Sequence, residues 1–309
     1  MRNNQPQKNF ASGAKTTKLP PEVEFQKKSI VFCSSAQHLN PSLADVLQAK
    51  KIETKLHYFT AGEALVTINS KCEDHVYIVQ SFGLDTNNAI IEFLLTVNAA
   101  RNAGAQYIHA IILYMAYSRQ DRMLEEYSSI GIQIVADLLN HSGVNNLTTI
   151  DIHEPNSMNL FNMPSTNISG IEIAKAKSLH VNKLVVLPDH GGLKRIGDLD
   201  TDFVYFTKKR YKTKLALELH GDVKGKDCLI IDDIIDSGRT ICAASEILTK
   251  YGARSVKAFV THALFSEATY ALIDKSQISH ITISNTIDNE CNIPKIVEVV
   301  DISGIIGLI

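Results

Sequence analysis

Two adjacent aspartates, Asp232 and Asp233, follow an apolar run at residues 228–231. Such a run is typical of a buried parallel strand, and we expect this strand to end where the acids begin. Carboxylates at a strand end can accept hydrogen bonds from the hydroxyl groups of a ligand. Aspartates also occupy turns that bind nothing, so the pair alone leaves a structural role open.

A short loop of small and polar residues comes next, and a helical pattern then runs to Tyr251. Backbone N–H groups at a helix start point at a ligand, and the helix dipole favours negative charge there. This stretch therefore predicts an anion site. Acids beside an anion suit a ligand that also carries hydroxyl groups or a metal, as a sugar phosphate does. The loop residues are Asp236, Ser237, Gly238, Arg239 and Thr240.

In open parallel sheets, ligands bind beyond the carboxyl ends of the strands, so polar residues after other apolar runs are further candidates. One such cluster spans residues 117–122 and contains Arg119, Gln120 and Asp121. Two arginines, an amide and an acid can clamp a phosphate and read a base edge. A solvated charged loop has the same composition and is the alternative.

Two further clusters contain possible metal ligands. We expect a strand over residues 147–153 that places Asp151 and His153 on one face, where His153 can contact a metal or a phosphate. Asp189 precedes paired glycines and offers the hard oxygen that Mg²⁺ prefers. The alternatives are a structural histidine and a plain turn.

Two last clusters are a basic run and a turn. Lys208 and Arg210 belong to the basic run, whose composition is also that of a solvated, mobile loop. The turn places an aromatic residue and an acid around a glycine, in the order Phe59, Thr60, Ala61, Gly62 and Glu63.

The elements that must position these residues alternate between strand and helix patterns, which predicts parallel sheets covered on their faces. We expect strands at residues 28–35, 53–59, 65–69, 75–82, 107–115, 147–153, 184–187, 203–206, 228–231, 256–260, 281–284 and 296–300. We expect helices at residues 43–51, 87–102, 130–141, 171–178, 240–251 and 267–274. The fold class is therefore α/β, with two units of comparable size.

Length and composition agree with an α/β protein of two units. A chain of 309 residues can form two domains with full cores. The net charge of −2 gives no reason to expect nucleic acid, and no apolar run reaches the length of a membrane span. The five cysteines lack metal or redox spacing and suit a reducing cytoplasm.

The predicted boundaries are a disordered tail at 1–28, an N-terminal domain at 29–165 and a C-terminal domain at 166–290. Residues 291–309 are predicted to return to the N-terminal domain.

Taken together and in order, these strings match one family. From about residue 29 to residue 301, the chain resembles the ribose-phosphate diphosphokinases, also called phosphoribosyl diphosphate (PRPP) synthetases, with the type I phosphoribosyltransferase fold. The matching strings are residues 117–122, 151–153, 188–192, 208–210, 221–240 and 285–287. The resemblance implies two similar phosphoribosyltransferase-type domains, each a mainly parallel sheet flanked by helices.

The resemblance also implies the chemistry. Mg-ATP would give its diphosphoryl group to the C1 hydroxyl of ribose 5-phosphate, leaving AMP. The implied ATP-binding residues are Phe59, Ala61, Gly62, Glu63, Arg119, Gln120, Asp121 and His153, with the residues of the 59–63 turn reaching in from a neighbouring subunit. The implied ribose-5-phosphate site comprises Arg210, Asp232, Asp233, Asp236, Ser237, Gly238, Arg239 and Thr240. His153 and Asp189 would bind Mg²⁺, and Lys208 and Arg210 would be catalytic residues on a mobile loop.

The implied assembly is a homo-oligomer, either a dimer or a dimer-based hexamer. Two alternatives are a non-catalytic member that regulates an active synthetase, and a phosphoribosyltransferase that consumes PRPP. Retention of His153, Asp189, Lys208 and Arg210 argues against the first, and the second α/β unit argues against the other. The sequence departs from the family at Ala61, where relatives have an acid.

Overall fold

The chain is described here from a computed structural model, which covers residues 27–189, 192, 201–211, 214–289 and 293–308. Most of the predicted tail lies outside this range. The described helices include none that is long and apolar enough to cross a membrane.

The first domain is built on a parallel sheet. Over the described ranges, its strand order is β2-β1-β5-β6-β7-β8. The strands are β1 (Lys28–Phe32), β2 (Lys50–Lys51), β5 (His75–Gln80), β6 (Tyr107–Ile112), β7 (Asn146–Ile150) and β8 (Ser165–Ile168). The helices are η1 (Ser34–Leu39), α1 (Ser42–Val46), α2 (Thr86–Asn102), α3 (Gly131–His141) and η2 (Pro155–Leu160). Phe93 of α2 and Leu139 of α3 pack with Ile78 and Ile108 of the sheet in one buried core.

A two-stranded hairpin, β3 (Thr54–Tyr58) and β4 (Ala64–Ile68), stands apart from this sheet in the pairing pattern. Its turn carries Phe59 to Glu63. The Phe59 amide donates to the Glu63 carbonyl over 2.8 Å, and Gly62 adopts the left-handed backbone that a tight turn needs.

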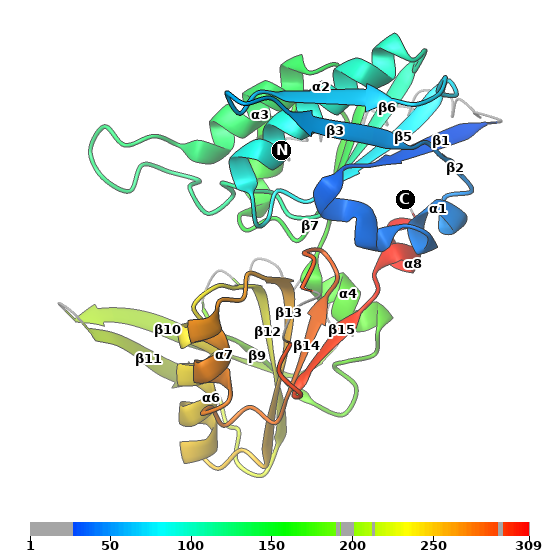
Figure 1. Cartoon of the computed structure of the whole chain (residues 1–309). Helices are drawn as coiled ribbons and strands as arrows, with labels where there is room; N and C mark the ends of the chain where they lie inside the picture. Colours follow the sequence, from blue (N-terminus) through cyan, green and yellow to red (C-terminus); the bar gives the residue numbers. More distant parts are fainter. Residues whose placement is uncertain (1–26, 190–191, 193–200, 212–213, 290–292, 309) are drawn as a thin grey trace, which may run out of the picture.

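The second domain repeats the architecture. Its sheet, within the described ranges, has the order β11-β10-β9-β12-β13-β14-β15, and β10 and β11 form its antiparallel pair. The strands are β9 (Leu184–Leu187), β10 (Phe203–Tyr211), β11 (Lys214–His220), β12 (Asp227–Ile235), β13 (Ser255–Ala263), β14 (His280–Ser284) and β15 (Val297–Val300). The helices are α4 (Gly170–Ala176), α6 (Arg239–Lys250), α7 (Glu267–Ile273) and α8 (Ser303–Ile306). Figure 1 shows the two sheets as separate layers joined through α4 and the C-terminal segment.

The predicted α/β class with two parallel-sheet domains is confirmed. A continuous apolar core joins the domains, because residues of β1 and α1 pack in the same cluster as residues of β9, β12 and β13. The C-terminal segment serves both units: β15 pairs with β14 in the second sheet, and α8 lies beside α1 of the first domain (Figure 1). Ser42 Oγ and Ser303 Oγ are 2.8 Å apart at that contact.

The prediction of a helix over 43–51 is wrong in its second half. The helix α1 ends at Val46, Gln48 takes a left-handed backbone with φ of 51°, and Lys50–Lys51 pairs with β1 as a strand. A non-glycine residue in the left-handed region interrupts a right-handed helix.

Two buried histidines of the first sheet, His75 and His109, give a prediction about acid stability. Their rings are stacked with centroids 6.4 Å apart, and His109 shares a 2.8 Å hydrogen bond with Thr148. Burial lowers the pKa of both histidines to about 4. The charge of Lys28 adds to this effect at His75, and His75 adds to it at His109. Below about pH 6.5 the two histidines bind protons in the unfolded chain but stay neutral in the folded chain. The folded state therefore becomes less stable as the pH drops from about 6.5 towards 4.

We expect the free energy of unfolding to fall by about 2 kcal/mol per histidine between pH 7 and pH 5, or by about 4 kcal/mol from the pair. Urea unfolding at the two pH values measures the change. His109→Gln should reduce this pH dependence, whereas His141→Gln, at the exposed end of α3, should leave it intact. Equal pH dependence in both variants would show that the pair is not responsible.

Candidate active site at the carboxyl edge of the second sheet

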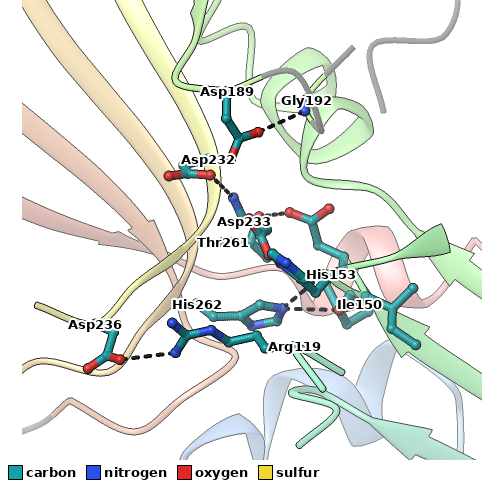
Figure 2. Close-up of polar contacts among 12 residues, drawn as sticks. Arg119, Ile150, His153, Asp189, Gly192, Asp232, Asp233, Asp236, Thr261 and His262 are labelled. Atoms are coloured by element: carbon teal, nitrogen blue, oxygen red, sulfur yellow. Dashed lines mark hydrogen bonds and ion pairs between the residues drawn. The ribbon is translucent and has the colours of Figure 1, made fainter. Parts of the chain in front are cut away.

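A pocket lies at the carboxyl end of β12, and it collects predicted residues from both domains (Figure 2). Its lining comprises Arg119, His153, Asp189 and the continuous stretch from Asp232 to Ile241. Strand ends from different parts of the chain meet here because parallel strands present their carboxyl ends at one edge.

The acid pair lies within a strand and not after one. We expected the strand to end at residue 231, but β12 continues through Asp232 and Asp233 to Ile235. The reason is the neighbouring strand β13, which stays in register so that Ile235 pairs with Ala263. Both acids are buried, and Asp232 Oδ1 accepts a 3.0 Å hydrogen bond from the Asp233 amide.

The predicted anion loop lies directly after β12. Gly238 has a left-handed backbone with φ of 72°, and α6 begins at Arg239, so Thr240 belongs to the first helical turn. Thr269 of α7 anchors the loop by donating a 2.6 Å hydrogen bond to the Asp236 carbonyl. The N–H groups of the first turn of a twelve-residue helix thus open into the pocket, as an anion site requires.

Two residues of the first domain contact this second-domain stretch. His153 Nδ1 is 2.6 Å from Asp233 Oδ2, and Arg119 Nη1 donates to Asp236 Oδ2 over 3.0 Å (Figure 2). The Asp233 side chain is only 4% exposed, whereas Arg119 and Asp236 are about half exposed. The site is therefore shared between the domains, through a part-buried contact between His153 and Asp233 and a more exposed ion pair between Arg119 and Asp236.

Asp189 follows β9 and lines the same pocket as His153. Its Oδ1 accepts a 3.1 Å hydrogen bond from the Gly192 amide. Among the residues that the structure describes, no group of three or more histidine, cysteine or acidic side chains forms a ready metal site. Mg²⁺ needs no such cage, because it is commonly held by one or two carboxylates together with substrate phosphates and water.

The predicted strand over 147–153 is too long. The strand β7 ends at Ile150, and Asp151 has a left-handed backbone with φ of 40°. Asp151 and His153 therefore do not share a strand face: Asp151 is buried against Thr261, whereas His153 contacts Asp233.

The basic run is not the loop that we expected. Residues 208–210 belong to β10, which extends to Tyr211 because it pairs with β11 as far as Tyr211 and Lys214. The side chains of Lys208 and Arg210 lie outside what the structure describes, so their catalytic role stays a prediction.

Several predicted ATP-binding residues lie outside the pocket. Phe59, Ala61, Gly62 and Glu63 occupy the exposed hairpin turn, and Phe59 is 49% exposed. Gln120 and Asp121 follow Arg119 along the chain but do not line the pocket, and the Gln120 carbonyl accepts from the Ile132 amide of α3 at 3.4 Å.

Sequence reasoning missed Thr261 and His262, at the end of β13. Both are buried, and they contact residues 150–151 of the first domain. The only local signal was a polar pair after the apolar run 256–260, the same signal that identified the other strand ends.

An acid pair in a central strand, an anion loop at the start of the next helix and two parallel-sheet domains define a protein of the phosphoribosyltransferase fold class. A solved structure of phosphoribosylpyrophosphate synthetase from Mycobacterium smegmatis has the same fold, with a TM-score of 0.81 over 92% of this chain and 97% of that one, at 23% identity.

The sequence comparisons identify the family. Residues 29–143 match the N-terminal domain of ribose phosphate pyrophosphokinase, and residues 200–308 match the phosphoribosyl synthetase-associated domain. A ribose-phosphate pyrophosphokinase of Vibrio cholerae is 35% identical over 79% of this chain and 82% of its own length. The Aquifex aeolicus protein of that name is 31% identical over 90% and 93%. The chain belongs to the ribose-phosphate pyrophosphokinase family.

Proposed function

We propose that this protein transfers the diphosphoryl group of ATP to the C1 hydroxyl of ribose 5-phosphate. The sugar oxygen attacks the β-phosphorus, the bond to the α-phosphate oxygen breaks, and AMP leaves as PRPP forms. The observation that carries the proposal is the shared pocket, in which Arg119 and His153 of the first domain contact the acid and loop residues of the second.

The sugar phosphate fits the second-domain side of the pocket. Its 5-phosphate would occupy the anion loop, from Asp236 to Thr240, at the N-terminus of α6. Asp232 and Asp233 would accept hydrogen bonds from the ribose hydroxyl groups. A ligand with both hydroxyl and phosphate groups matches a pocket in which buried acids adjoin an anion site.

ATP and Mg²⁺ would occupy the side of the pocket that faces the first domain. Arg119, with Gln120 and Asp121 beside it, would hold the nucleotide, and a guanidinium binds phosphate well through its forked donors. His153 and Asp189 would hold Mg²⁺, which when bound neutralises phosphate charge. Lys208 and Arg210 would meet the charge that develops on the transferred group, since phosphoryl transfer relies mainly on positioning and electrostatic stabilisation.

The hairpin turn supports a homo-oligomer. Phe59 is half exposed and lies outside the pocket of its own chain. It would stack on the adenine of a neighbouring subunit, with Ala61, Gly62 and Glu63 next to it. A dimer, or a hexamer built from dimers, satisfies this requirement.

The test of the function is direct. Incubation of the protein with Mg-ATP and ribose 5-phosphate should produce AMP and PRPP in equal amounts. Absence of turnover with any nucleoside triphosphate would favour a regulatory member of the family, and consumption of added PRPP with a nucleobase would favour a phosphoribosyltransferase.

Ala61→Asp should sharpen the choice of nucleotide. A methyl group cannot accept a hydrogen bond from the adenine amino group, whereas the carboxylate of an acid at this position can. One hydrogen bond contributes about 0.5–1.5 kcal/mol, or about 2- to 12-fold in affinity. We expect the variant to raise the ATP-over-GTP ratio of kcat/KM by such a factor. Thr60→Asp, which adds the same charge one residue away, is the control, and equal ratios in the two variants would contradict the assignment.

A further inference from the structure

A buried hydrogen bond joins the two domains beside the proposed site. Thr261 Oγ1 of β13 donates to Asp151 Oδ2, at the end of β7, over 2.5 Å. Asp151 is 3% exposed and Thr261 is fully buried, so water does not compete for this bond. Asp151 belongs to the 151–153 string, but no role has been assigned above to Thr261 or to this contact.

The surrounding backbone is shaped around this contact. Asp151 has a left-handed φ of 40°, which is costly for a residue with a side chain and persists only where the surroundings impose it. A Cβ atom on Gly170 would lie 2.3 Å from Asp151 Oδ2 and 2.5 Å from Thr261 Oγ1. The lack of a side chain at Gly170, at the start of α4, therefore leaves the space that this hydrogen bond occupies.

His262 also contacts the end of β7, next to Asp151. Its Nε2 is 3.1 Å from the Ile150 carbonyl, and its Nδ1 is 2.9 Å from Thr286 Oγ1. Because a carbonyl only accepts, Nε2 carries the proton and donates, and a neutral ring can accept from Thr286 at Nδ1. Burial lowers the pKa of His262, although the nearby carboxylates of Asp151 and Asp233 oppose that effect.

The register of β12 and β13 connects this contact to the site. Asp232 pairs with Val260 and Ile234 with His262, which puts Asp233 opposite Thr261. Thr261 thus lies on the strand next to Asp233, the acid that contacts His153 (Figure 2). Its hydroxyl donates to Asp151, two residues before His153.

We infer that Thr261 is a positioning residue for the proposed diphosphoryl transfer, and that it acts through Asp151 to hold His153 against Asp233. This inference rests on the proposed function. Small displacements of groups that bind a reacting substrate can cost about 100-fold in rate. A hydroxyl remote from the substrate can therefore affect turnover through the loop at 151–153.

A role confined to domain packing is the alternative. The domains share other contacts that do not lead to His153, including a large apolar core and a 2.7 Å hydrogen bond from Ser81 Oγ to the Thr286 carbonyl. Loss of one hydroxyl at Thr261 should leave these in place. Its effect should therefore be local to the 151–153 loop.

The test compares two buried threonines. Thr261→Val removes the hydroxyl and keeps the shape, and Thr261→Ser keeps the hydroxyl. Thr149→Val is the matched control, because Thr149 of β7 is also fully buried and its hydroxyl has no hydrogen-bond partner among the described residues.

Each variant is assayed for kcat and for KM of ribose 5-phosphate. The His153 ring resonance is recorded by NMR at one pH and assigned by its loss in His153→Gln.

We expect Thr261→Val to lower kcat about 10- to 100-fold, with KM for ribose 5-phosphate within about twofold of wild type. The His153 resonance should shift in this variant alone, and Thr261→Ser should recover most of the turnover. If Thr261→Val does not fold, Gly170→Ala breaks the same contact by displacement and carries the same expectations.

Equal kcat in Thr261→Val and Thr149→Val would overturn the inference, as would an unmoved His153 resonance or a Thr261→Ser variant as slow as Thr261→Val. If the wild-type protein makes no PRPP, the proposed function fails on its own. The resonance then still decides whether Thr261 positions His153, because it does not depend on turnover.

Discussion

Replacement of Lys208 by alanine should lower kcat by about 100-fold or more while leaving the affinity for ribose 5-phosphate nearly unchanged. A cation that meets charge developing only in the transition state affects the rate more than the binding of the ground state. Removal of one such electrostatic contact typically costs about 100- to 1,000-fold. Steady-state kinetics gives kcat, and calorimetric titration with ribose 5-phosphate gives the affinity.

Lys209→Ala is the matched control for this experiment. It removes the same charge from the next residue of β10, and successive residues of a strand face opposite sides. We expect Lys209→Ala to retain turnover within a few-fold of wild type. If both variants were equally active, Lys208 would be an ordinary lysine of the strand, and its assignment as a catalytic residue would be wrong.

The fold class was predictable because central strands of a parallel sheet are buried on both faces. Residues 75–80 and 107–112 accordingly form nearly continuous apolar runs, as does the first part of β12 at 228–231. Strand ends were less predictable. The strand β12 continues through two aspartates because its backbone pairs with β13, and ladder hydrogen bonds do not depend on side-chain polarity.

The candidate site was partly predictable from the same logic. Polar residues after apolar runs led to Arg119, His153, Asp189 and the stretch at 232–240, which do line one pocket. The role of Thr261 depends on Asp151, 110 positions earlier in the chain, and no local pattern carries that information. The 59–63 turn lies outside the pocket, and its predicted role requires a second subunit.

Asp233→Asn should lower kcat/KM by about 100-fold or more. The carboxylate is buried and 2.6 Å from His153 Nδ1, and in the proposed complex it also accepts from a ribose hydroxyl. Hydrogen bonds to a charged group contribute about 1.5–3 kcal/mol each, or about 10- to 150-fold. The amide has one acceptor oxygen instead of two and no charge, so it weakens both interactions without changing the shape of the side chain.

Two readouts separate these interactions. Weaker ribose 5-phosphate binding in Asp233→Asn, by about 10-fold or more in calorimetric titration, would report the lost sugar contact. A shift of the His153 resonance would report the lost imidazole contact.

Asp222→Asn is the control, because Asp222 is an exposed acid that caps the Lys224 amide and lies outside the pocket. If Asp233→Asn matched this control in kcat/KM, the acid would only stabilise the end of β12, and the sugar would have to bind elsewhere. Loss of sugar affinity with an unmoved His153 resonance would show that Asp233 binds the substrate but does not orient the histidine, which would separate the two roles that the structure combines in one carboxylate.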